Sequence, residues 1–238
     1  MGFDESAWNY FVSSDHRTGE DLEFIKVYFK GINFEKLLDV ASGAGHFANI
    51  FNAKLKVISD LSLNMLKTAR RQYRFRHLVR CDATVLPFKD RSFDIITCRI
   101  AFHHFQMPSE FFKESSRVLK PKGFLVLIDS IVDIDDDELN KIEKIRDNTH
   151  YRSHTVNEIL SFAKNFRLLS FHTIFKKHNF EEWAKRLSPT EDRFKMIEEA
   201  FLELNEEIKR ELKLEIENGK VISYTDKKGI FIFQSLAG

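Results

Sequence analysis

Three histidines are the side chains in this sequence that best suit acid–base chemistry at neutral pH. His103 and His104 are neighbours in the stretch "CRIAFHHF", and His150 lies in "RDNTHYRS". Imidazole titrates near neutrality, so each ring can accept the proton of a phenol or an enol. We treat His104, His150 and His103 as candidate catalytic bases; the alternative is that they order their loops or pack beside a cofactor.

Charged side chains flank His150 and suit the binding of an acidic group. Arg146 and Asp147 precede this histidine, and Arg152 follows it. A guanidinium group can hold a carboxylate, a phosphate or a developing enolate. We therefore predict that Arg146, Asp147 and Arg152 line a substrate pocket, with a structural network at a helix end as the alternative.

Residues that suit a nucleoside follow three apolar runs in the first half of the chain. The first run ends in "ASGAG", where Gly43 and Gly45 allow a ligand to approach the backbone closely. Asp60 ends the second run, where a carboxylate accepts the hydroxyls of a ribose. Asp82 ends the third run, and with the N–H of Ala83 it can recognise adenine. Together these positions predict a ligand that contains a nucleoside.

The elements that must position these residues alternate between strands and helices. The predicted strands are 36–41, 55–60, 77–82, 93–99 and 123–130, and the predicted helices are 45–53, 62–73 and 109–120. Such alternation forms βαβ units and a parallel sheet, whose ligands bind at the carboxyl ends of the strands. Ser62 and Ser109 are predicted to cap the second and third helices.

The pattern changes after residue 130. The predicted elements are a helix within "DIDDDELNKIEKIRDN", a helix at 155–165, a strand at 166–177, a long helix opening at the capping box 188–191, a hairpin at 218–219 and the last strand "GIFIFQSL". The predicted fold class is α/β: a Rossmann-like, seven-stranded, mostly parallel sheet with antiparallel C-terminal strands. Helices cover both faces, and a helical lid is inserted after strand five.

We predict one domain over residues 1–238, in three parts. Residues 1–130 form a cofactor-binding half, residues 131–210 form a lid and substrate-side helices with strand six, and residues 211–238 form the C-terminal hairpin and last strand. The long, regular alternation without repeats or an obvious linker favours this single domain.

Composition excludes several other classes of protein. The hydrophobic fraction of 43% and charged fraction of 31% are those of a soluble globular protein, and no apolar run approaches the ~20 residues of a membrane span. The net charge of +1 provides no general field for nucleic acid. Two cysteines, Cys81 and Cys98, match neither a disulfide framework nor a metal motif. We expect a cytoplasmic protein with no metal and no membrane partner; the oligomeric state is not predicted.

Two ligands fit the glycine loop on the residues alone. The spacing of Gly43, Gly45 and Ala48 matches the Gly-x-Gly-x-x-Ala pattern of NAD enzymes, which also place an acid after strand two. S-adenosylmethionine, which likewise contains ribose and adenine, fits the same positions. One observation favours RNA binding, the basic and aromatic run "ARRQYRFRHLVR" at 69–80. That run covers a helix end and the start of strand three, toward the sheet edge and away from the methyl group, so a solvated face is the better explanation.

Residues 37–130 resemble the class I S-adenosylmethionine-dependent methyltransferases, in particular the group similar to ubiquinone/menaquinone-biosynthesis methyltransferases. The stretches that carry the resemblance are "LLDVASGAGHFA", "VISDLSLNMLKTAR", "CDATVLPFKDRSFDIITCRIAFHHF" and "SSRVLKPKGFLVLIDS". The segments "LPFKDRSFDII" and "RVLKPKG" have no role in an NAD enzyme. The second half is similar to small bacterial methyltransferases of the same group.

The resemblance implies S-adenosylmethionine as cofactor and S-adenosylhomocysteine as product. It implies a cofactor site with Asp39 and the loop at the methionine part, Asp60 at the ribose, Asp82 with Ala83 at the adenine, and the Arg99 carbonyl beside the sulfonium. The full predicted cofactor set is Asp39, Ala41, Ser42, Gly43, Gly45, Asp60, Leu61, Asp82, Ala83 and Arg99. Ala41 departs from the glycine that this family usually has.

The predicted function is methyl transfer to oxygen, carbon or nitrogen of a small, partly apolar or aromatic metabolite. The chain lacks the Asn/Asp-Pro-Pro-Tyr/Phe motif after strand four, which disfavours methylation of amides and exocyclic amines. The alternatives are an RNA or protein methyltransferase, an NAD-type oxidoreductase, and a cofactor-binding protein that has lost catalysis.

Overall fold

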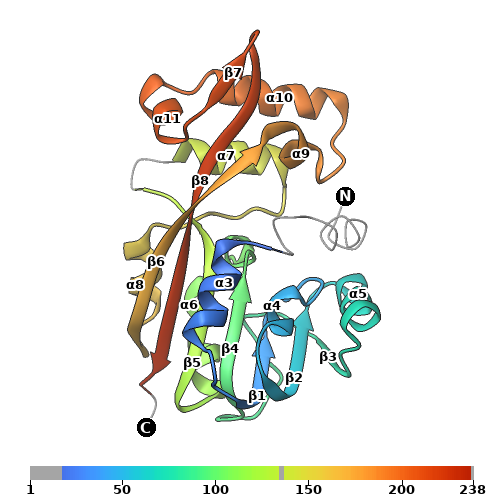
Figure 1. Cartoon of the computed structure of the whole chain (residues 1–238), viewed down its shortest axis with the longest axis vertical. Helices are drawn as coiled ribbons and strands as arrows, with labels where there is room; N and C mark the ends of the chain where they lie inside the picture. Colours follow the sequence, from blue (N-terminus) through green and yellow to red (C-terminus); the bar gives the residue numbers. More distant parts are fainter. Residues whose placement is uncertain (1–17, 134–136, 237–238) are drawn as a thin grey trace.

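The structure, a computed structural model, describes residues 18–133 and 137–236, which form two lobes (Figure 1). The lower lobe contains most of one twisted sheet and the helices on its two faces. The upper lobe contains four helices and a short strand. Two long strands, β6 (Phe166–Asn179) and β8 (Lys220–Ser235), cross from one lobe to the other and hold them together.

The described sheet has the order β3-β2-β1-β4-β5-β8-β6, with β7 paired to β8. The remaining strands are β1 (Phe34–Asp39), β2 (Ala53–Asp60), β3 (His77–Arg80), β4 (Phe93–Arg99), β5 (Leu119–Ile131) and β7 (Glu215–Glu217). The first five strands pair in parallel, and β8 runs antiparallel to β5 and β6. The strand order reverses at β1, between β2 and β4, where open α/β sheets bind ligands.

Helices cover both faces of the sheet in the lower lobe. On one face lie α3 (Glu20–Tyr28), α4 (His46–Asn49) and α5 (Leu63–Tyr73); on the other lie α6 (Pro108–Val118) and α8 (Val156–Phe162). Strand β8 shows why two cores form: Ile230 and Ile232 join the first face, whereas Phe231 and Phe233 join the second. Successive strand residues point to opposite faces, so one apolar run supplies both cores.

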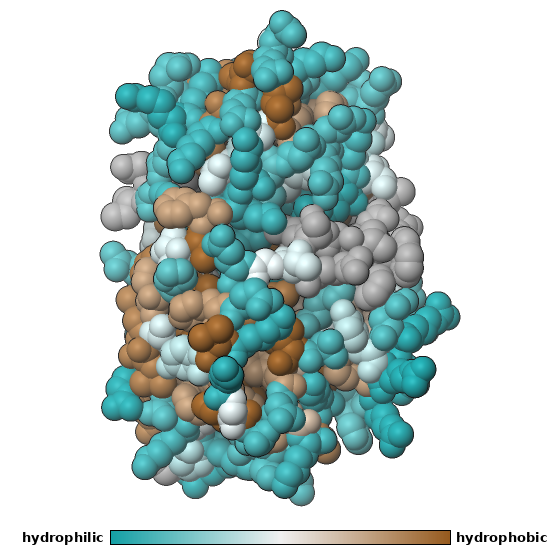
Figure 2. Space-filling view, viewed as in Figure 1, coloured by the Kyte–Doolittle hydropathy of each residue, from teal (hydrophilic) through white to brown (hydrophobic). Residues whose placement is uncertain are grey.

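The upper lobe has a separate apolar core. Its helices are α7 (Asp137–Arg146), α9 (Phe180–Lys185), α10 (Glu191–Leu202) and α11 (Glu206–Glu211). Trp183, Phe201 and Tyr224 pack together there, with ring centroids 4.9–5.8 Å apart. Hydrophilic side chains dominate the outer surface of this lobe, whereas hydrophobic ones gather over the lower lobe (Figure 2). No helix in residues 18–133 or 137–236 combines the length and apolarity that a membrane crossing needs.

The α/β fold with a mostly parallel sheet and helices on both faces is as predicted, and several local predictions can be judged. Ser62 caps α5, because its Oγ accepts the N–H of Met65 at 3.1 Å. The predicted cap at Ser109 is wrong, since Pro108 already occupies the first position of α6. The predicted capping box at 188–191 is also displaced: Thr190, not Ser188, caps α10.

Three larger differences concern elements whose partners are distant in sequence. The last hairpin arm and the last strand are one continuous strand, β8, because its pairing with β6 persists from Asn179–Ser223 to Phe166–Ser235. Helix α8 packs beside α6 in the lower lobe and not in the lid. Helix α3 was not predicted; it buries Leu22 and Ile25 against the sheet.

Candidate active site

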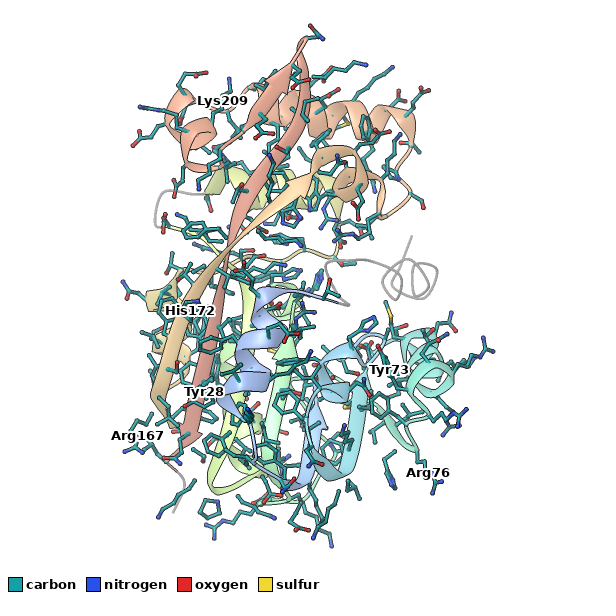
Figure 3. All side chains as sticks on the ribbon, viewed as in Figure 1. Tyr28, Tyr73, Arg76, Arg167, His172 and Lys209 are labelled. Atoms are coloured by element: carbon teal, nitrogen blue, oxygen red, sulfur yellow. The ribbon has the colours of Figure 1, made fainter. Side chains whose placement is uncertain are left out.

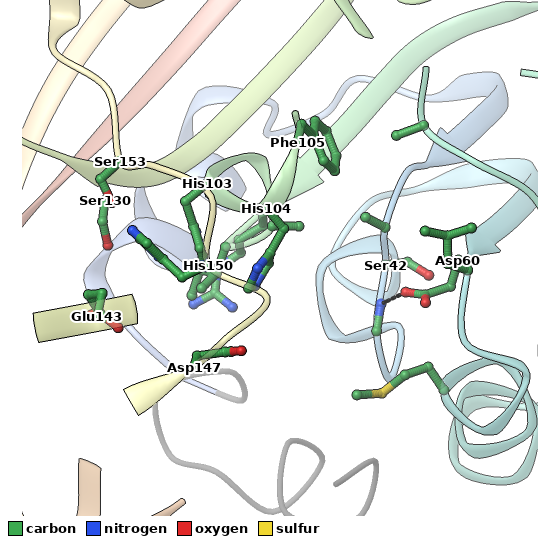
Figure 4. A pocket seen from close by; sticks show the side chains of 18 of the residues that line it. Ser42, Asp60, His103, His104, Phe105, Ser130, Glu143, Asp147, His150 and Ser153 are labelled. Carbon is green, nitrogen blue, oxygen red and sulfur yellow. Dashed lines mark hydrogen bonds between the residues drawn. The ribbon is translucent and has the colours of Figure 1, made fainter. Parts of the chain in front are cut away.

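A cavity of about 420 Å³ opens at the carboxyl ends of the parallel strands, between the two lobes (Figure 4). One end is lined by the glycine loop and the ends of β2 and β3. The other is lined by the segment after β4, by α7 and by the crossing strands. Thirteen predicted site residues line it: Ala41, Ser42, Gly43, Asp60, Leu61, Asp82, Ala83, Arg99, His103, His104, Arg146, Asp147 and His150. The sheet therefore gathers residues from many separate segments of the sequence around one space.

Asp60 organises the glycine loop. Its Oδ2 accepts the N–H of Gly43 at 2.8 Å and its Oδ1 accepts the N–H of Ser62 at 2.8 Å (Figure 4). The carboxylate thus bridges the turn after β1 and the start of α5 while it faces the cavity. A charged acceptor in this position suits hydroxyl groups of a ligand.

The loop itself offers a cradle for a polar group. Gly43 has φ +53°, and a Cβ built there would have only the Met65 sulfur nearby, at 4.0 Å. The Oγ of Ser42 is buried and has no hydrogen-bond partner among the described residues. Because buried hydroxyls nearly always have a partner, this orphaned Oγ indicates that a ligand completes the site.

Gly45 has a packing role in this structure, and its predicted approach to the ligand stays a prediction. It does not line the cavity, and a Cβ there would lie 2.7 Å from the ring of Phe75 and 3.3 Å from Ala69. Its φ of +83° also favours glycine. Gly45 lets α4 start against α5; Gly43 is the glycine that faces the cavity.

Asp39 lies beneath the loop and does not line the cavity, and its predicted place at the methionine part of the ligand stays a prediction. Its carboxylate accepts the hydroxyl of Thr97 at 2.5 Å and the N–H of Ala48 at 3.3 Å. Burial raises its pKa to about 7, more than these hydrogen bonds lower it. Asp39 therefore ties β1, β4 and α4 together from behind the site.

This burial predicts a pH-dependent stability difference. The pKa of Asp39 in the folded protein exceeds its ordinary value of 3.8, so stability is lost as pH rises from about 4 to about 7. Asp39→Asn, which retains the shape but not the charge, should match the wild type near pH 4. At pH 8 it should be more stable, by up to about 4 kcal/mol. Thermal unfolding at both pH values measures this; parallel pH profiles would contradict it.

The adenine end of the cavity is formed after β2 and β3. Asp82 Oδ1 accepts the N–H and the hydroxyl of Thr84 at 2.8 and 2.7 Å, which fixes the turn that carries Ala83. Leu61 is 59% exposed and lines the cavity next to them. An exposed leucine beside two acids suits a flat ring with a polar edge.

The chain is constrained where β4 ends, at Arg99 and the following Ile100. The Arg99 Nε donates to Asp21 of α3 at 2.6 Å, and both side chains are at least 96% buried. Ile100 has φ +53°, an uncommon conformation for a β-branched residue. Both residues line the cavity. Helix α3 is thereby tied to the strand end where the resemblance places the reacting centre.

His103 forms a buried pair with Asp129, at the end of β5. Its Nδ1 lies 2.6 Å from Asp129 Oδ1, and the carboxylate also accepts the N–H groups of Ala101, His103 and Ser130. Burial alone would lower the pKa of His103, but the charge of Asp129 raises it overall. Burial would raise the pKa of Asp129, yet His103 and these donors lower it to about 2. The pair thus favours a charged imidazolium.

His104 and His150 are held as neutral rings. His104 Nδ1 lies 3.0 Å from the carbonyl of Thr149, so Nδ1 carries the proton. His150 Nε2 lies 2.9 Å from Asn140 Oδ1, which also accepts the N–H of Ser153, so Nε2 carries the proton. Burial, together with the nearby His103, lowers the pKa of His104 to about 3. Burial and His103 lower the pKa of His150 to about 4, against the opposing effect of Glu143.

The three rings form one cluster. The centroid of His103 lies 4.1 Å from that of His104 and 5.3 Å from that of His150 (Figure 4). In the part of the chain that the structure describes, no group of histidine, cysteine or acidic side chains has the arrangement of a metal site. Of the three rings, His103 is the one whose pKa is raised, so it is the ring that takes up a proton most readily.

Helix α7 contributes a second charged pair. Arg146 donates to Glu143 from Nε and Nη2, at 3.0 and 2.9 Å, and its guanidinium lies 4.4 Å from the ring centre of Trp183. Asp147, also on the cavity wall, accepts the N–H and hydroxyl of Thr149. This network fixes the segment that carries His150.

Arg152 does not line the cavity, and its predicted place in the substrate pocket stays a prediction. Its guanidinium lies 3.3 Å from Glu158 and is 42% exposed. Its N–H donates to the carbonyl of His103 at 2.9 Å, a backbone contact that fixes the segment while the side chain pairs with α8. The closeness of Arg152 to His150 in the sequence did not reveal that the Arg152 side chain points toward α8.

The most important residue that the sequence analysis missed is Asp129. It follows the apolar run "FLVLI" at the end of a predicted strand, so the rule that selected Asp60 and Asp82 also applies to it. Glu143, Trp183, Asp226 and Lys228 also line the cavity. Glu143 and Trp183 belong to the upper lobe and Asp226 and Lys228 to β8, and the positions of these elements depend on pairing between segments that are distant in sequence.

Comparison with known proteins assigns this architecture to a family. A protein-family model described as "Methyltransferase domain" matches residues 38–127. The uncharacterized methyltransferase YcgJ of Bacillus subtilis is 32% identical over 209 residues, which cover 82% of each chain. The chain belongs to this methyltransferase family.

Further relatives agree with the assignment. A crystal structure of a putative methyltransferase from Bacillus halodurans superimposes on this methyltransferase with a TM-score of 0.85 and 32% identity, covering 91% of this chain and 99% of that one. A demethylmenaquinone methyltransferase of Thermotoga maritima is 37% identical over 102 residues, which cover 41% of this chain and 44% of that protein. The predicted resemblance is confirmed, and the NAD-type oxidoreductase alternative is set aside.

Proposed function

We propose that this methyltransferase uses S-adenosylmethionine to methylate a small molecule whose reacting group bears a proton, and that His103 accepts this proton. The observation that carries the proposal is the pairing of His103, which lines the same cavity as the glycine loop, with the buried Asp129 behind it. His103 thus places a candidate base on the wall of the cavity that also contains the proposed cofactor site.

The residues of the loop end suit the cofactor. The orphaned Ser42 Oγ and the N–H groups of the loop match the amino-acid part, Asp60 matches the ribose hydroxyls, and Asp82 with Ala83 and Leu61 matches the adenine. Bound there, S-adenosylmethionine supplies an activated methyl group on a sulfonium. Asp39 and Gly45 support this site from behind, without contact with the cavity.

The protein's own part in the reaction is to position the acceptor and to remove a proton. Asp129 holds the Nδ1–H of His103, which leaves Nε2 as the proton-accepting atom of the neutral ring. Asp129 then balances the charge of the imidazolium. His104 and His150, which stay neutral, offer hydrogen-bond acceptors that orient the reacting hydroxyl or enol.

A small acceptor fits better than a macromolecule. The cavity lies between the lobes, and its volume of about 420 Å³ is typical of small-molecule sites. The basic run at 69–80 includes β3, the edge strand of the sheet, where Arg76 points away from the lower lobe (Figure 3). The relative named a demethylmenaquinone methyltransferase supports a small aromatic acceptor. We further propose that residues up to 130 bind the cofactor and that the later segments, apart from α8, enclose the acceptor.

Calorimetric titration with S-adenosylmethionine, S-adenosylhomocysteine and NAD tests the cofactor. We expect saturable binding of the first two and none of NAD. A radiolabelled methyl-transfer screen over metabolite extracts and RNA then tests the acceptor. Label in small metabolites would support the proposal. Failure to bind S-adenosylhomocysteine, or label in RNA alone, would contradict it.

A further inference from the structure

Asn140 is a buried polar residue within helix α7. It is 5% exposed and shares the buried side of this helix with the apolar residues Leu139 and Ile142. Asparagine favours caps and turns over helix interiors, and a buried amide without partners destabilises a fold. The contacts of Asn140 must therefore explain why a polar side chain occupies this position.

Ser153 fixes the orientation of the Asn140 amide from two sides. The N–H of Ser153 donates to Asn140 Oδ1 at 2.7 Å, and Asn140 Nδ2 donates to the carbonyl of Ser153 at 3.2 Å. With the amide reversed, its NH₂ group would face the Ser153 N–H, donor against donor. The amide oxygen is therefore the atom that lies 2.9 Å from His150 Nε2, and this ring nitrogen carries the proton.

The other ring nitrogen of His150 keeps its lone pair. A neutral imidazole has one N–H and one nitrogen that accepts a hydrogen bond. Nδ1 forms no hydrogen bond with any described residue and is not sealed off by them, and His150 lines the cavity. Asn140 itself does not line the cavity, so it can act on a bound molecule only through this ring.

The segment that Asn140 holds also contacts the loop of the proposed base. The N–H groups of Tyr151 and Arg152 both donate to the carbonyl of His103 at 2.9 Å. Ser153, which binds the Asn140 amide, is the next residue along the chain. One side chain of α7 thus connects the upper lobe to the segment that fixes the His103 loop.

We propose that Asn140 is a positioning residue, which presents the lone pair of His150 Nδ1 to the methyl acceptor so that this nitrogen accepts a hydrogen bond from it. The inference rests on the proposed function, because it needs a small methyl acceptor in this cavity. The hydrogen bond requires a neutral ring. Burial and the nearby His103 lower the pKa of His150 to about 4, against the effect of Glu143, and the neutral amide of Asn140 adds no charge that would reverse this.

Asn140→Asp separates a positioning role from a structural one. Aspartate has the same shape and can still accept hydrogen bonds from His150 and Ser153, but its negative charge beside Nε2 should raise the pKa of His150. The charged groups that already face this ring are Glu143 and Arg146 from α7, Asp129 from β5, and His103. Below its raised pKa the ring would be charged, and Nδ1 would lose its lone pair and become a donor.

Two measurements test the proposal. The first is ¹⁵N NMR of full-length protein with labelled histidines, saturated with S-adenosylhomocysteine and assigned with His150→Gln. At pH 7 it should show His150 protonated at Nε2 and not at Nδ1. The second is kcat/KM with the acceptor found by the methyl-transfer screen. At pH 6, Asn140→Asp should be about tenfold below the wild type, the contribution of one hydrogen bond, and the ratio should approach one at pH 9.

Asn52→Asp is the matched control. It adds the same charge at an exposed residue before β2, at the end of the strand away from the cavity, and should match the wild type at both pH values. A proton on His150 Nδ1 in the wild type would overturn the proposal, and so would wild-type kcat/KM in Asn140→Asp at pH 6. An equal loss at pH 6 and pH 9 would show a structural role only and would overturn it as well.

The affinity for S-adenosylhomocysteine distinguishes the remaining outcomes. It reports folding of each variant, and if Asn140→Asp does not fold, the wild-type NMR spectrum decides. A wild type that neither binds S-adenosylhomocysteine nor labels a small metabolite contradicts the proposed function itself, and the role of Asn140 is overturned with it. Binding and labelling without the expected pH-dependent loss contradict only the role of Asn140.

Discussion

Asp60→Asn is expected to weaken S-adenosylhomocysteine binding at least about 100-fold while the protein stays folded. The carboxylate would lose two charge-assisted hydrogen bonds to the ribose, and each such bond contributes about 1.5–3 kcal/mol. The substitution also weakens the bond to the Gly43 N–H that shapes the loop. Since 1.4 kcal/mol corresponds to a factor of ten, the combined loss exceeds two orders of magnitude.

Calorimetry and thermal unfolding measure this effect together. Glu35→Gln is the matched control, because Glu35 is an exposed acid on β1, at the end of the strand away from the cavity. The control should bind S-adenosylhomocysteine as the wild type does. An Asp60→Asn variant that retains the wild-type affinity would show that the carboxylate only shapes the loop and does not contact the ligand.

Much of the site was predictable because one rule of parallel sheets positions it. Asp60, Asp82 and Arg99 each end an apolar run, and the structure brings all three to one cavity. Asp129 ends such a run as well, so it was within reach of the same rule. For these residues the local pattern is sufficient, because the carboxyl ends of parallel strands meet at one edge.

The structure differs from the sequence-based expectation where the local pattern does not define the direction of a side chain or the neighbours of the backbone. A glycine motif shows that the backbone is crowded but not by what: Gly45 avoids Phe75, which is thirty residues away in sequence. Arg152 is close to His150 in sequence, yet its side chain pairs with Glu158 of α8. Both outcomes depend on the packing of a second element, which spacing alone does not specify.

Asp226 and Lys228, which also line the cavity, were not predicted from the sequence for a different reason. Asp226 and Lys228 lie in a stretch that reads as a turn between two strands, and they reach the cavity only because β8 continues through it. That continuity comes from pairing with β6, fifty residues earlier, as Lys176–Asp226 and Ile174–Lys228 show. A register between distant strands is set by the whole sheet and by both lobes.

The three histidines differ in pKa, which is raised for His103 and lowered for His104 and His150, so their replacement should affect catalysis to different extents. His103→Ala should lower kcat by about 10²–10⁴-fold, the usual contribution of a general base, and leave S-adenosylhomocysteine affinity within about twofold. His104→Ala and His150→Ala should lower it less, because burial holds their pKa values near 3 and 4 and makes them weak bases. His77→Ala, at an exposed histidine on β3, is the control.

Asp129→Asn separates a base from a merely structural histidine. The asparagine amide would donate to His103 Nδ1 and force the proton onto Nε2, so kcat should fall up to about 10⁴-fold. The pH dependence of kcat shows in which direction Asp129 shifts the pKa of His103. Asp129 raises the pKa of His103, so wild-type activity should rise with pH through a midpoint above 6.5, the ordinary value. In Asp129→Asn the residual activity should have a lower midpoint, because the imidazolium loses its counter-charge.

The measurements are rates with the acceptor found by the methyl-transfer screen and an NMR titration of ¹⁵N-labelled histidines without it. The NMR titration must account for the charged neighbours of His103, namely Asp129 from β5 and Glu143 and Arg146 from α7, and for the coupled ring of His104. A His103 midpoint that does not move in Asp129→Asn would refute the pairing. A His103→Ala variant with wild-type kcat would refute the base, and the acceptor would then react without losing a proton to this cluster.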